Sequence, residues 1–223
     1  MLACLRNVVI LTICVAVFVY LVNIWLANKK YIFSEEAIIK IGKKYQEPTV
    51  DMKKVIESIH KDFKAMYPDH ILPKDDVQFV FFNAGGWLGA IYMMHASLTE
   101  FVLVYGTTMD TSGHSGRYWV NRTDIILSGE MLEWKEGEVK SKVHKPGSVV
   151  KYAWGEASAV TYKANMWKLS YGRGFIPSAL PYVTSSYIFG NHDYLSLYNM
   201  FKIHVKSFWQ EFVYCITHIN ELF

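Results

Sequence analysis

Residues 8–27 carry the most uniform hydrophobic pattern in the chain. They contain no charged side chain, and Asn23 is their one strongly polar residue. A helix rises about 1.5 Å per residue, so about twenty residues cross the ~30 Å hydrocarbon core of a bilayer. The pattern predicts an uncleaved, single-pass anchor within residues 1–30. A cleaved signal peptide is the alternative, but no small-x-small cleavage site follows cleanly.

Two amphipathic patterns follow and predict a helical connector over residues 31–76. The acidic residues of 34–36 favour a helix N-terminus, and isoleucines supply an apolar side just after them. A second helix is expected to open near Thr49 and to end before Pro68. Its apolar positions share one face and are Val55, Ile56, Ile59, Phe63 and Met66.

Residues 77–177 change to a β-rich texture, with short runs of aromatic and β-branched residues. Glycine, proline and asparagine mark turns at residues 135–137, 145–147 and 163–165. Many short strands at close spacing indicate a small barrel or sandwich. The expected strands cover residues 79–82, 101–105, 119–127, 149–152, 157–162 and 166–171.

The tail, residues 178–223, has an amphipathic pattern of another kind. Between 194 and 223 the polar residues recur mostly three or four apart among aromatic and aliphatic ones. This predicts a helix with a narrow polar stripe and a broad apolar face, preceded by an amphipathic segment at 178–187. Lys202, Lys206 and Glu211 would be costly in mid-bilayer, which favours a helix lying in the membrane plane. A core helix of the β-rich region is the alternative.

Composition supports a membrane protein and excludes several other classes. Apolar content is 52% and charged content 19%, and the net charge of +3 includes no basic run of the kind that binds nucleic acid. Cys4, Cys14 and Cys215 support neither a disulfide framework nor a zinc site. His95 and His114 lie far apart without carboxylates near them in sequence. We therefore expect no metal and no cofactor.

The side of the membrane on which the body lies is left open by the sequence. The lysines after the apolar segment outnumber the basic groups before it, which favours a cytosolic body under the positive-inside rule. Residues 121–123 form a glycosylation sequon. A glycan on Asn121 would instead place the body in the lumen.

One long segment, residues 83–119, joins an apolar run without charge from 83 to 99 to the polar corner GHSGRYW. With TDIILSG at 123–129, GEASAV at 155–160 and YGRGFIPSALP at 171–181, it resembles the family of the sigma-1 receptor and the fungal sterol C-8 isomerases. The resemblance extends over essentially the whole chain. It implies an α+β fold: one N-terminal transmembrane helix, a cupin-like β-barrel and C-terminal amphipathic, membrane-facing helices.

The same resemblance implies an assembly and a location. Members form homotrimers or larger assemblies in the endoplasmic reticulum membrane and nuclear envelope. In them a glycine-rich segment helps to build the subunit contact. Tight turns within one subunit are the alternative role for these glycines. The matching residues here are Gly85, Gly86, Trp87, Leu88 and Gly89.

The resemblance also implies a ligand pocket in the barrel. Asp124 matches one of two acids that bind a hydrophobic amine, although the strand pattern alone favours a structural, hydrogen-bonded Asp. The second acid is missing, because Ser170 stands at its position. Either the pocket has lost its cation anchor, or Asp124 takes the amine itself. The other pocket residues that the resemblance implies are Phe101, Leu103, Tyr105, Tyr118 and Tyr162.

Two other acids could replace the missing one. Glu100 is near in sequence, although in relatives it braces the backbone, and Glu156 is the second candidate. Without a replacement, an isomerase lacks the second of the two acid/base groups that shifting a double bond requires. The sequence therefore favours a protein that is not an enzyme.

The function that we expect is a receptor or chaperone-like modulator that binds hydrophobic amine- or sterol-like ligands. It would interact with membrane lipids, sterols and other membrane proteins such as channels and receptors, and would regulate lipid distribution. A sterol C-8 isomerase and a trimeric scaffold with a degenerate pocket are the alternatives.

Overall fold

The computed structural model describes residues 2–46 and 51–218, which fall into two compact units, Met1–Ile32 and Phe33–Phe223. The first unit is dominated by helix α1, Leu2–Asn28, whose described side chains are mostly exposed. Within it, Cys4–Asn28 has the length and composition to cross a membrane. No other helix among the described residues meets that test. One N-terminal apolar helix is therefore confirmed.

The second unit begins with a pair of amphipathic helices. Helix α2, Glu35–Lys44, starts where the acidic pattern predicted, and the Ser34 side chain caps it by accepting a hydrogen bond from the Ala37 amide. Helix α3, Met52–Met66, buries the predicted apolar face except for Met66, which is exposed. The expected opening near Thr49 lies outside the described residues.

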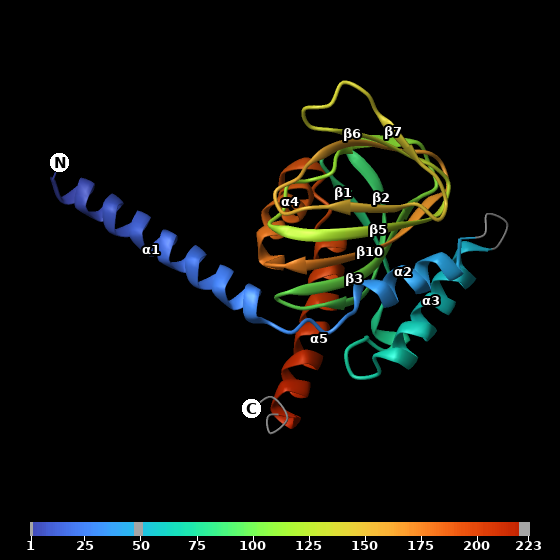
Figure 1. The fold of residues 1–223 in the computed structure, drawn as a ribbon, viewed down its shortest axis with the longest axis horizontal. Helices are drawn as coiled ribbons and strands as arrows, with labels where there is room; N and C mark the ends of the chain where they lie inside the picture. Colours follow the sequence, from blue (N-terminus) through green and yellow to red (C-terminus); the bar gives the residue numbers. More distant parts are fainter. Residues whose placement is uncertain (1, 47–50, 219–223) are drawn as a thin grey trace. The chain divides into compact units, whose positions relative to one another are not determined.

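Ten strands form two antiparallel sheets, which together make the β domain (Figure 1). The six-stranded sheet has the order β1 (Phe79–Ala84), β2 (Trp87–Ala96), β3 (Glu100–Thr107), β10 (Met166–Gly174), β5 (Val120–Ser128), β8 (Val149–Tyr152). The four-stranded sheet has the order β4 (Thr111–His114), β9 (Ser158–Tyr162), β6 (Met131–Lys135), β7 (Lys142–His144).

Both sheets are open, so of the barrel and sandwich that the pattern predicted the β domain is closer to a sandwich. The edge strands β8 and β7 span four and three residues, so they offer few backbone groups for joining the sheets along that side. The α+β class itself is confirmed. A 3-10 turn, Lys74–Asp76, leads into the β domain, and a second, Ile176–Ala179, leads out of it.

The glycine-rich segment at residues 85–89 forms a tight hairpin. Gly85 and Gly86 have φ of 61° and 97° and connect β1 to β2, with Ala84 paired to Trp87. Such backbone angles favour glycine. A Cβ on Gly89 would lie 2.5 Å from the carbonyl oxygen of Gly106. These glycines therefore have a role within one subunit, and the oligomer contact remains a prediction.

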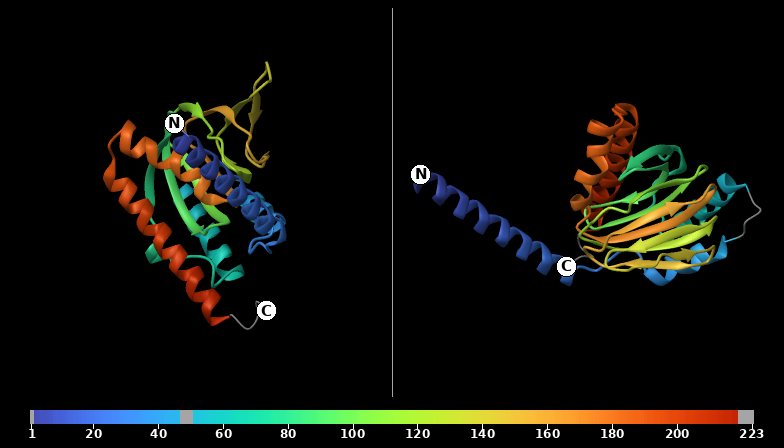
Figure 2. Two further views of the ribbon diagram at one scale, coloured as in Figure 1. Left: turned by 90° about the vertical axis from the view of Figure 1, so that its left-hand side faces the viewer. Right: turned by 90° about the horizontal axis from the view of Figure 1, so that it is seen from above.

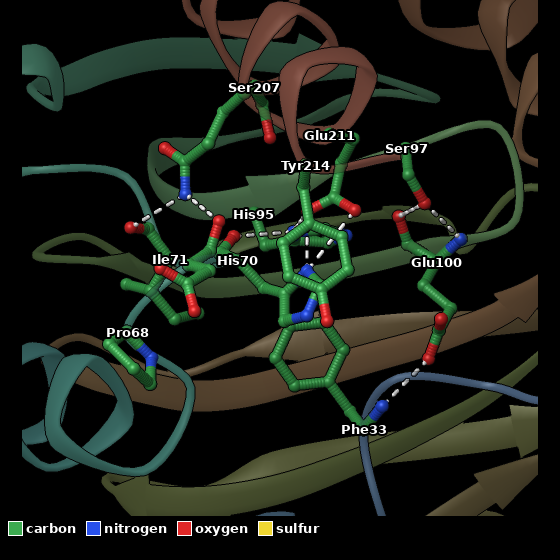
Figure 3. Close-up of polar contacts among 12 residues, drawn as sticks. Phe33, Pro68, His70, Ile71, His95, Ser97, Glu100, Ser207, Glu211 and Tyr214 are labelled. Carbon is green, nitrogen blue, oxygen red and sulfur yellow. Dashed lines mark hydrogen bonds and ion pairs between the residues drawn. The ribbon is translucent and has the colours of Figure 1, made fainter. Parts of the chain in front are cut away.

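The tail folds into helix α4 (Leu180–Ser185), a π-helical turn (Ser186–Gly190) and the long helix α5 (Tyr194–Thr217). Helix α5 lies against β1 and β2 of the six-stranded sheet (Figure 2). Its polar stripe faces the body. Ser207 accepts a hydrogen bond from the amide of Ala96 at 2.8 Å. Glu211 lies 3.0 Å from Nδ1 of His70 and 3.5 Å from Nδ1 of His95 (Figure 3).

The opposite face of α5 is apolar and exposed. Phe201, Trp209 and Phe212 have exposed fractions of 66%, 64% and 55%. Since soluble proteins seldom expose contiguous apolar patches of this kind, such a face marks an interaction surface. The predicted amphipathic helix is present. Its inward side is mixed, with Ser196, Met200, Ile203 and Ser207 buried, while most of its large apolar side chains stay exposed.

Candidate functional site

An apolar cavity of about 610 Å³ opens between the two sheets and continues to helices α4 and α5. Its inner wall comes from β2, β3, β5, β9 and β10, and its outer wall from α4 and α5. This volume is typical of a small-molecule pocket. Outer-wall residues include Leu180, Val183, Leu197, Phe201, Trp209 and Phe212.

Strand alternation places the inner-wall residues. Across the β3–β10 ladder, Tyr105 pairs with Lys168 and Leu103 with Ser170. Because alternate residues of a strand point to one face, the side chains of Lys168 and Ser170 project to the same side of the sheet. The next ladder pairs Ser170 with Asp124 on β5. Four predicted pocket positions are thus brought together by two registers.

Asp124 is fully buried and its carboxylate is already bound by other side chains. Lys168 Nζ donates to Oδ2 at 2.7 Å, and the Ser170 hydroxyl donates to Oδ1 at 2.6 Å. Arg122 Nε lies 3.3 Å from Oδ2. Burial alone would favour the protonated acid, but Arg122 and Lys168 outweigh it and hold the pKa of Asp124 below its ordinary value.

Arg122 is held mainly by aromatic faces. Its guanidinium carbon lies 4.1 Å from the ring centroid of Tyr152 and 5.9 Å from that of Tyr118. Burial opposes its charge, yet Asp124 and the neighbouring tyrosines raise the pKa of Arg122 above the ordinary value. Arg122 Nε has no hydrogen-bond acceptor among the described residues, which leaves donor capacity in the cavity wall.

Six of the seven predicted ligand residues line the cavity: Phe101, Leu103, Tyr105, Tyr118, Tyr162 and Ser170. Asp124 does not line it, because Arg122 and Lys168 stand in front of the carboxylate and do so themselves. The sequence analysis did not single out these two cations as pocket residues. A signal was present, since Lys168 is two positions from Ser170 and Arg122 is two positions from Asp124.

Neither proposed replacement acid reaches the cavity. Glu100 is fully buried, and its Oε1 accepts hydrogen bonds from the Phe33 amide at 3.1 Å and the Tyr171 hydroxyl at 2.9 Å. Glu100 therefore braces the backbone where the second unit begins. Glu156 is exposed and accepts a hydrogen bond from the amide of Ala153.

The described residues contain no group of three or more His, Cys, Asp or Glu side chains that could hold a metal ion. His95 Nδ1 donates a hydrogen bond to the carbonyl oxygen of His70 at 2.8 Å. His114 Nδ1 accepts a hydrogen bond from the amide of Gly116. The two histidines serve different local contacts.

The fold and site define a protein with one apolar N-terminal helix, an apolar cavity in a two-sheet β domain and an apolar C-terminal cover. The family model described as "ERG2 and Sigma1 receptor like protein" matches residues 9–215. The chain belongs to this family. This membership and the single apolar helix are consistent with a membrane protein.

Two relatives illustrate the range of the family. The sigma non-opioid intracellular receptor 1 of Danio rerio is 43% identical over 183 residues, which cover 82% of each chain. The "Protein erg2 homolog" of Dictyostelium discoideum is 36% identical over 137 residues, covering 61% of this chain and 58% of that one. Membership with such relatives supports a receptor-type function.

Among solved structures, an RmlC-like cupin from Shewanella frigidimarina aligns with 47% of this chain and 90% of its own. Its sequence identity is 10% and its TM-score 0.40.

Proposed function

We propose that this protein is a membrane receptor that holds a hydrophobic ligand between its two sheets and helices α4 and α5. The observation that carries the proposal is the continuity of the cavity. One wall consists of buried strand residues and the other of tail-helix residues whose apolar side chains are also exposed. A ligand dissolved in lipid could therefore enter from the same surface that contacts lipid.

Polar contacts between helix α5 and the rest of the second unit support a tail whose apolar side faces lipid. Lys206 pairs with Asp76, and Gln210 donates to the carbonyl oxygen of Ile71 at 3.2 Å. These contacts satisfy polar groups that would be costly against hydrocarbon. The exposed side of α5 is then mostly apolar, with Lys202 as its exposed charged residue among the described positions. We propose that this face lies on the endoplasmic reticulum membrane or the nuclear envelope, with α1 as a single-pass anchor.

We further propose that the ligands are sterol-like or amphiphilic, and that the receptor regulates lipid distribution and partner membrane proteins such as channels and receptors. The homotrimer remains part of the proposal, with Gly85, Gly86, Trp87, Leu88 and Gly89 as contact residues. A hydrophobic amine is the less favoured ligand, because it would have to displace Lys168 from Asp124.

A sterol isomerase is the second candidate, and the erg2 homolog in the family is its motivation. The site argues against it. Ser170 cannot donate and take back a proton as a carboxyl group does, and Asp124 is bound by Lys168 and Ser170. Incubating the purified protein with a Δ8-sterol should give no Δ7 product. Conversion of the sterol faster than by an Asp124→Asn variant would support the isomerase hypothesis.

The receptor proposal is tested by saturable binding of photoactivatable cholesterol to the full-length protein in detergent micelles. Leu103→Trp fills the cavity wall and should abolish labelling, whereas Val143→Trp on the exposed side of β7 should leave it unchanged. Thermal unfolding of both variants checks that they are folded. Labelling that does not saturate, or that Leu103→Trp leaves intact, would refute the cavity as the ligand site.

A further inference from the structure

The charged groups that line the cavity all have the same sign. Arg122 and Lys168 are the only Asp, Glu, Lys or Arg residues among the described lining residues. Burial keeps three further lining groups neutral. Burial raises the pKa of Tyr105 and Tyr118, so their hydroxyls remain protonated, and burial lowers the pKa of His204. A ligand in the cavity therefore meets two cations and no exposed carboxylate.

Asp124 neutralises only one of these two cations. Two positive side chains surround a single carboxylate, which leaves one formal positive charge. Neither of the other buried acids of the β domain supplies a second anion. Glu133 pairs with His144, whose Nε2 lies 2.9 Å from its Oε2, and Glu100 accepts hydrogen bonds from the Phe33 amide and the Tyr171 hydroxyl. Among the described residues, no ion pair joins Glu133 to Arg122 or Lys168. The cluster of Arg122, Asp124 and Lys168 therefore carries one positive charge that no buried acid neutralises.

The unused N–H donors of Lys168 and Arg122 also favour an anionic ligand. Lys168 uses two of its three N–H groups, one on Asp124 and one on the Tyr162 hydroxyl at 3.2 Å. The Arg122 guanidinium makes no hydrogen bond to another described residue. An arginine fork with free donors, beside an ammonium group, matches the geometry of a carboxylate or phosphate. An ammonium ligand would instead compete with Lys168 and Ser170 for the Asp124 oxygens, each of which already accepts a hydrogen bond.

We propose that the cavity binds a monoanionic amphiphile, with its carboxylate or phosphate head against Arg122 and Lys168 and its apolar chain toward α4 and α5. This inference rests on the proposed function, since it requires that the cavity admit a hydrophobic ligand at all. It adds the sign of the head group. The chain would lie along Leu103, Val183, Leu197 and Phe201, which line the path outward.

A series of probes that differ in head group only tests the proposal. Oleate, oleyl alcohol and oleylamine share one chain and carry a negative, a neutral and a positive head. Binding of each to the full-length protein in non-ionic micelles is measured at about pH 8.5, far above an ordinary carboxyl pKa. We expect oleate to bind at least about tenfold more tightly than the alcohol, and oleylamine to bind most weakly.

Variants then locate the head group. Lys168→Met leaves Arg122 paired with Asp124, so the cluster becomes neutral. Oleate should then fall to the affinity that oleyl alcohol has for the same variant, and thermal unfolding checks that the variant is folded. Lys142→Met removes an exposed lysine of β7 and should change nothing. Asp124→Asn adds a second uncompensated charge and should preserve or strengthen oleate binding, which a mere loss of fold would not do.

Two results would overturn the inference while leaving the proposed function intact. One is equal binding of oleate and oleyl alcohol to the natural protein. The other is a preference for oleate that survives in Lys168→Met. If none of the three probes binds saturably, the proposed function and this inference fail together. Oleoyl lysophosphatidylglycerol serves as a further arm, because its phosphodiester head carries one negative charge as oleate does. Tighter binding than oleate would identify a phosphate head, and weaker binding a carboxylate.

Discussion

Lys168 Nζ lies 2.7 Å from Oδ2 of Asp124, and the two side chains are only 6% and 0% exposed. The protein thus supplies its own ammonium group to the carboxylate that the family resemblance assigns to a ligand amine. The Ser170 hydroxyl donates a hydrogen bond to the other carboxylate oxygen of Asp124. Lys168 and Ser170 together make a closed set of partners for one buried acid.

Freeing Asp124 from this internal partner should create an amine site. We expect Lys168→Met to bind a radiolabelled hydrophobic amine at least about tenfold more tightly than the natural protein, because Asp124 regains an acceptor oxygen. Adding Ser170→Glu to Lys168→Met should increase the affinity again. Asp124→Asn in the Lys168→Met background is the control, and amine binding that persists there would show that Asp124 is not the acceptor.

The same pair predicts a stability that depends on pH. The pKa of Asp124 is depressed in the folded protein, so its contribution to stability is present above the unfolded-state value of about 3.9 and is lost as pH falls through the folded value. Thermal unfolding of the natural protein should weaken progressively below about pH 4. Asp124→Asn should show less of this decline.

At neutral pH we expect Asp124→Asn to destabilise the fold by about 3–5 kcal/mol, because it leaves Arg122 and Lys168 buried without their anion. Asp110→Asn is the matched control, since Asp110 and Lys163 form an exposed pair whose loss should cost at most about 1 kcal/mol. Equal losses for the two variants would mean that the buried cluster contributes no more than a surface pair.

Ser207 fixes helix α5 to the β domain. Replacing it by alanine removes the acceptor of the buried Ala96 amide and should cost about 1–3 kcal/mol. Hydrogen exchange at the Ala96 amide should quicken in this variant. Thr217→Ala, whose hydroxyl bonds carbonyl groups of its own helix at an exposed position, should leave both measurements unchanged. Unaltered exchange in Ser207→Ala would contradict the docking role.

Within the predicted subunit contact, Gly89 has a role in the fold of one subunit, whereas Leu88 is exposed and could contact a second subunit. Leu88 is 36% exposed, so Leu88→Arg should weaken oligomers, measured by light scattering with detergent correction, without lowering the unfolding temperature. Gly89→Ala should lower that temperature instead, because the new Cβ meets the Gly106 carbonyl. Oligomers that withstand Leu88→Arg would remove this segment from the interface.

Much of the architecture follows from local patterns. Each of the six expected runs overlaps an observed strand, since β-branched and aromatic residues dominate them. The three predicted turns contain Gly137, Gly147 and Asn165, all with positive φ. Strand β2 was not assigned as a strand, because its glycines and continuous apolar character carry no clear period. The short strands β4 and β7 contain too few apolar residues to stand out, and β6 spans only five residues.

Most of the residues that line the site could be predicted from the sequence, but the arrangement of their charges could not. Alternation places Lys168 beside Ser170, but its contact with Asp124 depends on the β5–β10 register, which shifts between Trp167 and Lys168. A bulge of this kind re-aims a side chain and leaves no mark in a single sequence. The choice between a barrel and a sandwich was left open for a related reason, since the pairing of edge strands is a long-range property.

The inward polar stripe of α5 has a thermodynamic consequence. With Ser207, Gln210 and Glu211 satisfied by the body, the helix presents hydrocarbon outward only while it stays docked. Detachment would expose those polar groups, and a bilayer solvates them worse than water does. On the proposed function, lipid would act as a ligand of the docked conformation, and mass action would couple membrane affinity to helix closure. The membrane itself would then keep the outer wall of the cavity in place.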